Sequence, residues 1–174
     1  MSEYNLNTGN INEWVLNLRA GDRVLLSGTV YTARDAAHKR IESLISENKE
    51  LPFDLEGAVI YYAGPTPAKD ELAVGSIGPT TSSRMDSFAE LMMSNGQKAM
   101  IGKGDRNAAV VDAMKKHGAV YFAAIGGAGA LYSRCVTECT VIAFEELGCE
   151  SIKRLVVKDF PLIVAIDSLG KSLY

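Results

Sequence analysis

The chain has 174 residues, 47% of them hydrophobic and 22% charged, which suffices for one well-packed domain over residues 1–174 and is short for two. Its net charge of -3 gives no basic field for a phosphate backbone, so we expect no nucleic-acid partner. The apolar runs are too short and too broken by glycine to cross a bilayer, and the polar start lacks the apolar stretch of a signal peptide. Three cysteines are an odd number that fits a reducing compartment, so we expect a cytoplasmic protein that does not bind membranes.

The first predicted strand leads directly into the first predicted helix. The sequence RVLLSGTVYT, residues 23–32, is rich in β-branched side chains and predicts a buried strand. The next segment, residues 33–50, places apolar side chains at helical spacing with charged residues between them. This segment is therefore predicted to be a helix.

The same order of strand, loop and helix recurs along the chain. Residues 57–97 and 98–118 each contain an apolar strand, a glycine-containing loop and a helical pattern, and residues 119–133 begin a fourth unit. The tail differs, because it holds two short β-rich runs, residues 151–159 and 161–170, on either side of Phe160. Strands that alternate with helices indicate an α/β fold, in which a layered sheet carries flanking helices.

If the strands pair in parallel, the loops that follow them lie at one edge of the sheet. Four of these loops place backbone amides, hydroxyls or a cation near the start of a helix: YTARDAAH, GPTTSSR, IGKGDR and GGAGA. A helix N-terminus has unsatisfied N–H groups and a positive dipole end, and Ser or Thr there adds donors. We therefore predict an anion-binding site at this edge.

Arg34, Arg84 and Lys103 are the candidate cations of this site. The alternative for Arg34 and Lys103 is a solvated surface charge, and the alternative for the hydroxyls of residues 80–83 is helix capping. Each of the two cations, however, follows an apolar strand in a short loop, and four hydroxyls in a row exceed what a cap requires. Arginine matches a carboxylate with two parallel hydrogen bonds and lysine adds a compact charge, so the set suits a small dianion.

His38 lies one helical turn after Arg34 and therefore on the same helix face. Asp35 precedes His38 by three residues, so the two side chains could pair across a turn. A structural role remains the default interpretation of a histidine on a helix face.

Cys135 and Cys139 are four residues apart on a predicted helix. Neither has a His or a third Cys nearby at metal-ligand spacing, and Cys149 stands beside a turn glycine. We interpret all three as buried hydrophobic residues rather than metal ligands.

These motifs, in this order, resemble the β subunit, equivalently the C-terminal domain, of class I iron-sulfur fumarate hydratase and its close relative L-tartrate dehydratase. The matching segments cover most of the chain beyond Leu25 and are SGTVYTARDAAHKRI, GAVIYYAGPTP, GSIGPTTSSRMDSF, MIGKGDR, AIGGAGAL and LVVKDFPLIVAIDSLG. The resemblance implies a swivelling β/β/α domain that closes over a [4Fe-4S] cluster held by a separate α subunit. This chain lacks the cluster motifs, so the resemblance implies that it holds no metal and works in a hetero-oligomer.

The resemblance also implies residue roles. In that family the residues matching Arg34, Arg84 and Lys103 bind substrate carboxylates, and the threonine matching Thr80 is the proposed catalytic base. The supporting residues beside them would be Asp35, His38 and Thr81. The implied reaction is the reversible hydration of fumarate to (S)-malate, with an iron of the partner's cluster as Lewis acid. The alternatives are the β subunit of L(+)-tartrate dehydratase and a stand-alone dicarboxylate-binding module.

Overall fold

A computed structural model describes residues 2–68 and 71–174 of the chain. Strands and helices alternate through most of it, as the sequence predicts. The elements, in chain order, are β1 (Glu3–Asn7), η1 (Thr8–Asn10), α1 (Ile11–Trp14), β2 (Arg23–Thr32), α2 (Asp35–Ser46), β3 (Val59–Tyr61), η2 (Ser82–Met85), α3 (Asp86–Ser94), β4 (Ala99–Gly102), α4 (Ala108–His117), β5 (Val120–Ala123), α5 (Gly129–Ser133), β6 (Val136–Ala143), η3 (Glu145–Glu150) and β7 (Ile152–Ile166).

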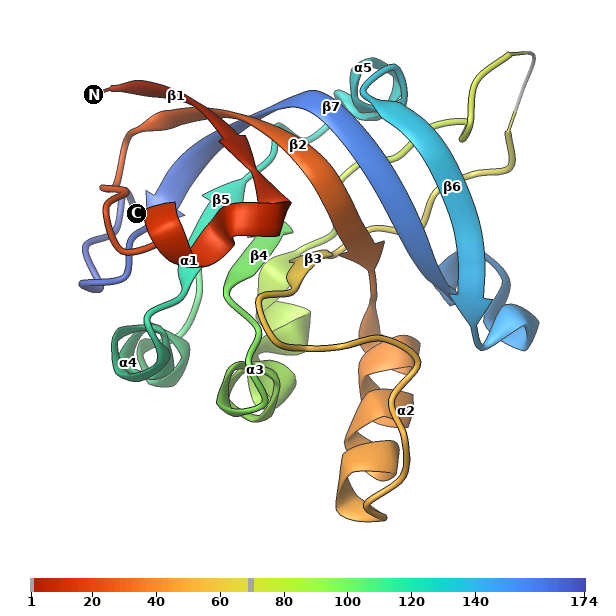
Figure 1. Cartoon of the computed structure of the whole chain (residues 1–174), viewed down its shortest axis with the longest axis horizontal. Coiled ribbons are helices and arrows are strands. Elements are labelled where there is room, and N and C mark those ends of the chain that lie inside the picture. Colours follow the sequence, from red (N-terminus) through yellow and green to blue (C-terminus); the bar gives the residue numbers. More distant parts are fainter. Residues whose placement is uncertain (1, 69–70) are drawn as a thin grey trace.

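The strands form a seven-stranded sheet in the order β1-β2-β3-β4-β5-β7-β6. Strands β1 to β5 pair in parallel, whereas β7 runs antiparallel to both β5 and β6. Strand β7 also pairs with β2 along most of its length, so the sheet curls and β2, β3, β4, β5 and β7 close into a barrel (Figure 1). The α/β class with flanking helices is confirmed, and the partial barrel closure is an addition to the predicted layered sheet.

The tail is a single long strand, so the prediction of two short β-rich runs is wrong. Strand β7 bends at Asp159, whose φ of 51° is unusual for a residue other than glycine. The bend falls where the register with β2 shifts, between the pairs Val157–Gly28 and Phe160–Leu26. Because β2 supplies partners on both sides of the bend, β7 continues through it as one strand.

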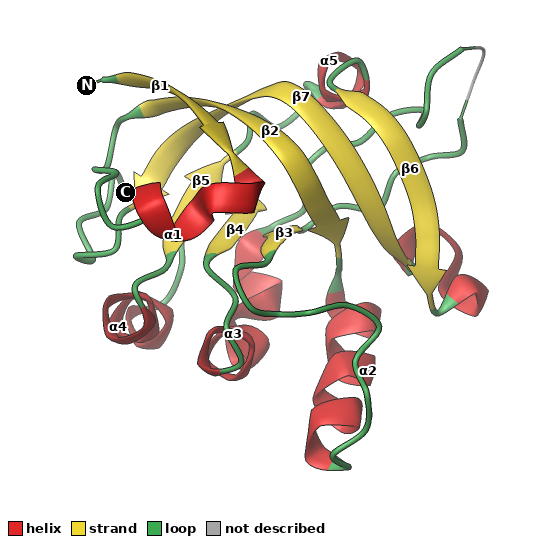
Figure 2. Cartoon of the chain, in the orientation of Figure 1, coloured by secondary structure: helices red, strands yellow, loops and turns green. Residues whose placement is uncertain are grey.

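The central strands β3, β4 and β5 are buried on both faces. One core cluster lines the barrel interior and includes Leu26, Tyr61, Phe122 and Phe160. The side chains between them point the other way and pack under the helices, as Ile60 does. Helices α2, α3 and α4 lie together on that side of the barrel (Figure 2), which is the arrangement expected of parallel strands covered by crossover helices.

Cys135 lies in the turn before β6 and Cys139 lies in that strand, so the predicted helix is wrong. Helix α5 ends at Ser133, and Cys139 lies within β6, opposite Leu155 of β7. Cys135 and Cys139 are partly buried against the barrel core, but Cys149 is exposed, which corrects the prediction that it is buried. The two runs of residues on β6 and β7 pair as a hairpin, and this long-range pairing overrides the helical spacing of the two cysteines.

Candidate functional site

The carboxyl ends of β2, β3, β4 and β5 lie at one edge of the barrel, as their parallel pairing requires. Arg34 follows β2 after one intervening residue, and Lys103 directly follows β4. The loop that carries Thr80 and Arg84 leaves β3 and returns to the same edge, where Pro79 pairs with Ala63 and Thr81 with Lys103. The fold therefore gathers these predicted site residues at one edge.

The backbone of Thr80 is fixed between the two neighbouring strand ends. Its N–H donates to the carbonyl of Tyr62 at 2.7 Å, and its carbonyl accepts from the Lys103 N–H at 3.4 Å. The Ser82 N–H in turn donates to the Lys103 carbonyl at 2.9 Å. Thr80 is partly buried and Thr81 is exposed.

The four hydroxyls do not cap the helix that follows them. Neither Thr81, which precedes η2, nor Met85, which precedes α3, makes a side-chain cap hydrogen bond. Ser82 is instead fully buried, and its hydroxyl bonds with the Tyr121 hydroxyl at 2.9 Å. Gly102 must be glycine for this packing, because a Cβ there would overlap Ser82 Oγ and lie 3.1 Å from the Tyr62 ring.

Arg84 is held by Asp35 at the start of α2. The Nε of Arg84 donates to Asp35 Oδ1 at 3.1 Å, and Nη2 lies 3.1 Å from Asp35 Oδ2. This pair corrects the predicted partner of Asp35, which was His38. Only the Nε contact is a hydrogen bond, because Asp35 Oδ2 accepts none among the described residues, and 51% of the Arg84 side chain stays exposed.

Arg34 is held more deeply. Its Nε lies 3.4 Å from Glu150 Oε1, and the side chains are 24% and 29% exposed. An ideal Cβ built on Gly64 would stand 3.2 Å from Arg34 Nη1 and 3.0 Å from the Cys149 carbonyl oxygen. The guanidinium therefore lies between the backbone after β3 and the turn before β7.

Lys103 lies beside the glycine loop that follows β5. A Cβ on Gly126 would be 3.6 Å from Lys103 Cδ and 4.0 Å from Nζ. Within residues 2–68 and 71–174, Lys103 Nζ makes no ion pair or hydrogen bond, whereas both arginines have a carboxylate partner. This exposed ammonium group is available to an anionic ligand.

His38 is buried and structural. Its Nδ1 lies 2.9 Å from the Arg34 carbonyl oxygen, to which it can donate, and its ring stacks on Phe88 and meets Tyr62 edge-on. Burial lowers the pKa of His38 to about 4, and the charge of Arg106 acts in the same direction. His38 is therefore neutral at pH 7, and its Nδ1 can donate a hydrogen bond to the backbone of Arg34.

Arg106 is a buried residue that the sequence alone did not single out. Its Nε donates to Asp86 Oδ1 at 2.6 Å, and its guanidinium lies 5.4 Å from the Tyr62 ring centroid and 5.2 Å from that of Tyr121. The Asp86 carboxylate also accepts from the Asn107 N–H at 3.0 Å. This ion pair ties the start of α3 to the loop after β4, and the motif GDR was its only trace in the sequence.

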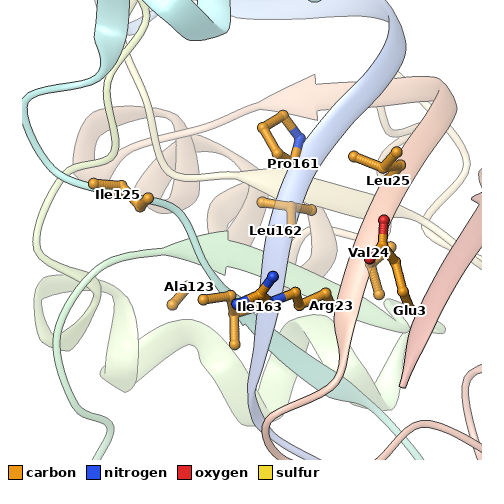
Figure 3. Close-up of a pocket in the computed structure, with 9 residues that line it drawn as sticks. All are labelled: Glu3, Arg23, Val24, Leu25, Ala123, Ile125, Pro161, Leu162 and Ile163. Atoms are coloured by element: carbon orange, nitrogen blue, oxygen red, sulfur yellow. The ribbon is translucent and has the colours of Figure 1, made fainter. Parts of the chain in front are cut away.

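An apolar hollow lies away from these residues (Figure 3). It has a volume of about 310 Å³ and is lined by side chains from β1, β2, β7 and the end of β5. Leu25, Pro161 and Leu162 surround it, and Ile125 borders it from the loop that leads to Gly126. None of the predicted site residues lines this hollow, so its apolar walls do not form part of the anion site.

Across residues 2–68 and 71–174, no three His, Cys, Asp or Glu side chains gather closely enough to hold a metal ion. The three cysteines therefore do not form the thiolate set that an iron-sulfur cluster requires. In the same part of the chain, no helix combines the length and apolarity needed to cross a membrane.

The comparison with protein families matches the whole chain, residues 1–174, to the family described as "Fumarase C-terminus". The chain therefore belongs to this family, which confirms the resemblance noted in its sequence.

Individual relatives fall into two groups. The chain is 43% identical over 166 residues to a protein of Methanocaldococcus jannaschii named "Putative L(+)-tartrate dehydratase subunit beta", covering 92% of this chain and 85% of that protein. It is 40% identical over 156 residues to fumarate hydratase 2 of Leishmania major and 40% identical over 154 residues to the anaerobic class I fumarate hydratase of Escherichia coli. These matches cover 88% and 87% of this chain but only 28% of each hydratase, so the chain spans little more than a quarter of their length.

Proposed function

We propose that this chain is the β subunit of a two-subunit hydro-lyase that reversibly hydrates fumarate to (S)-malate. The observation that carries the proposal is the gathering of three cations at the edge where Thr80 lies, in a member of the fumarase C-terminus family. Two are arginines oriented by carboxylates, and the third is a lysine without a partner among the described residues. Three cations at one edge match the two carboxylates of a C4 dicarboxylate. The name of the Methanocaldococcus relative, a subunit beta matched over 85% of its length, supports a separate partner subunit.

Arg34, Arg84 and Lys103 would bind the two carboxylates and orient the carbon chain between them. In the dehydration direction, Thr80 would take the proton from the carbon next to one carboxylate, and it would return that proton in hydration. A neutral threonine hydroxyl is a weak base, so it needs positive charge nearby. Lys103, whose backbone is bonded to that of Thr80, is the neighbouring cation without a carboxylate partner among the described residues.

The [4Fe-4S] cluster would belong to the partner α subunit, because the described cysteines do not form its ligand set. When bound there, the cluster would supply Lewis-acid chemistry for the substrate hydroxyl. This chain would then close over the substrate as a swivelling domain. A cytoplasmic location fits its three free cysteines.

The experiment is to assemble the chain with its candidate α subunit under anaerobic conditions with iron and sulfide, and to supply malate, fumarate and L-tartrate separately. Fumarate–malate interconversion that requires both chains supports the proposal. Turnover of L-tartrate instead supports the second candidate, the β subunit of L(+)-tartrate dehydratase. This candidate is favoured because the match covers 85% of the Methanocaldococcus protein. A cluster-loaded pair without either activity overturns both, and calorimetry with the isolated chain then tests a stand-alone dicarboxylate-binding role.

The role of Thr80 is tested in the same assembly. Thr80→Val should lower kcat about 100-fold with little change in KM, because removal of a general base costs roughly 10²- to 10⁴-fold. Thr81→Val is the matched control, since it removes the neighbouring, more exposed hydroxyl. Equal activity of the two variants would reject Thr80 as the base.

A further inference from the structure

We propose that Glu150 is a positioning residue of this site, which holds Arg34 by its Nε so that the two Nη groups are presented to a substrate carboxylate. The inference rests on the proposed function for the identity of the ligand. Glu150 lies far along the chain from Arg34, in the 3-10 segment η3 between β6 and β7, and no motif in the sequence connects the two.

The first support is the isolation of the two atoms that meet. Arg34 Nε and Glu150 Oε1 are buried, and among the described residues neither makes a hydrogen bond. They lie 3.4 Å from each other, so each is the charge partner of the other. A buried charged atom without such a partner is unfavourable. Glu150 therefore determines where the guanidinium of Arg34 settles.

The second support is the rigidity of the turn that carries Glu150. The side chain of Lys153 is buried, and its Nζ donates to the carbonyls of Gly148, Cys149 and Ser151 at 3.1 to 3.3 Å and bonds with Ser151 Oγ at 2.7 Å. One ammonium group thus ties together the backbone on both sides of Glu150. A carboxylate on such a fixed turn can orient its partner.

The third support is that this turn is attached to the strand leading to Arg34. The Thr32 hydroxyl, at the end of β2, accepts from the Lys153 N–H at 3.1 Å and lies 3.4 Å from the Ser151 carbonyl oxygen. Segment η3 lies at the β6–β7 end, next to the start of α2 (Figure 1). Glu150 and Arg34 are therefore held on two backbones that are bonded to each other.

The consequence for recognition follows from which donors are used. Glu150 engages Nε, so Nη1 and Nη2 remain for a carboxylate, and two donors in a planar fork suit bidentate binding. If Glu150 positions Arg34, its loss should weaken substrate binding. If Glu150 acts only through its negative charge, its loss should strengthen binding. Glu150→Gln removes a negative charge near the site, so substrate binding should tighten if Glu150 acts only through its charge.

The variant to test is Glu150→Gln in the assembled two-subunit enzyme. If Glu150 positions Arg34, KM for the dicarboxylate should rise about 20-fold, with a smaller change in kcat, because the loss of one oriented charge-assisted contact is of this size. Glu150→Asp should recover only part of the affinity, because its carboxylate is one methylene short. Unchanged or tighter binding in Glu150→Gln overturns the proposal.

Glu146→Gln is the matched control. Glu146 also lies on η3 and pairs with Arg40 of α2 at 3.1 Å, in an ion pair whose side chains are 53% and 58% exposed. This variant breaks a carboxylate–arginine contact between the same two elements without touching Arg34. If Glu146→Gln raises KM as much as Glu150→Gln, the effect comes from the docking of η3 on α2 and the positioning role is rejected.

A second measurement separates this inference from the proposed function. In NMR spectra of the chain, the Arg34 Nε–H signal, assigned by its loss in Arg34→Lys, should exchange with water at least tenfold faster in Glu150→Gln than in the wild type or in Glu146→Gln. Equal exchange rates in all three would reject the Arg34–Glu150 contact even if the enzyme is a fumarate hydratase. If the assembled pair shows no hydro-lyase activity but the exchange rates follow the expected pattern, the proposed function is rejected and the positioning role of Glu150 is retained.

Discussion

The two arginines of the candidate site are held in different ways. Arg84 makes a two-point ion pair with Asp35 and is 51% exposed, whereas Arg34 makes one contact with Glu150, is 24% exposed and lies between two backbones. Exposed ion pairs are worth little because water and salt screen them, and enclosed ones depend strongly on their partner. We therefore expect Arg34 to be a fixed anchor, and Arg84 to exchange its carboxylate partner for the substrate.

The largest effect should come from removing either arginine. Arg34→Ala should lower kcat/KM about 1000-fold and Arg84→Ala about 100-fold, because truncating a hydrogen-bonded charge partner costs roughly 2–5 kcal/mol and the more enclosed contact costs more. Steady-state kinetics of the assembled pair measure both values. Equal losses in the two variants, or a larger loss in Arg84→Ala, would contradict the distinction between a fixed Arg34 and an exchangeable Arg84.

The next effect concerns pH, because a buried titratable group supports Arg34. The folded-state pKa of His38 is about 4, below its ordinary value of 6.5, so its contribution to stability is complete above pH 6.5 and is lost as the pH falls toward 4. One pKa unit corresponds to about 1.36 kcal/mol, so this loss of stability amounts to about 3 kcal/mol. His38→Asn binds no proton, so the change in its unfolding free energy between pH 7 and pH 4 should be smaller by that amount. Urea titrations at the two pH values measure it, and identical changes in variant and wild type would contradict it.

A smaller effect is expected at Gly64, which lies against Arg34. Gly64→Ala would place a Cβ 3.0 Å from the Cys149 carbonyl oxygen and 3.2 Å from Arg34 Nη1, so the guanidinium must move. We expect KM to rise about tenfold, equivalent to about 1.4 kcal/mol. A double-mutant cycle with Arg34→Ala is the control, since the glycine substitution should have almost no further effect once Arg34 is gone. Additive losses would show that Gly64 acts by another route.

The smallest effect is expected at Asp35. Asp35→Asn releases Arg84 from an ion pair with one half-exposed side chain, so KM should change less than about fivefold, within the roughly 0.2–1 kcal/mol of such pairs. The difference from wild type should shrink further as the salt concentration rises. A change as large as that of Glu150→Gln would mean that both arginines are fixed anchors.

Local sequence patterns predicted much of the scaffold. The strand at residues 23–32 and the helix after it are confirmed, because β-branched residues and apolar residues at helical spacing each favour one structure. The helix ending at Gly118 is also confirmed, since this glycine takes a left-handed conformation with φ of 64°. These signals lie within a few residues of one another and can be read without knowing the fold.

Patterns failed where distant segments decide the outcome. The spacing of Cys135 and Cys139 suggested a helix, but Cys139 pairs with β7 as part of a strand and Cys135 lies in the turn before it. The tail is one strand because β2 pairs with it on both sides of Asp159. The predicted pairing of Asp35 with His38 was also wrong. Asp35 pairs with Arg84, which lies 49 residues away in the sequence, and His38 contacts the Arg34 carbonyl oxygen. Spacing along a helix cannot reveal such partners.

The sequence by itself determined which residues the site could use: the two arginines, the lysine and the hydroxyl run stand after strands, and parallel strands end at a common edge. Only the tertiary structure decided how each is held. Closure of the barrel through β2 and β7 brings the turn with Glu150 against Arg34, and packing of the loop after β3 buries Ser82 while leaving Thr80 accessible. The physical reason is that side-chain type is local, whereas burial, ion pairing and the pKa values that follow from them depend on segments far apart in the chain.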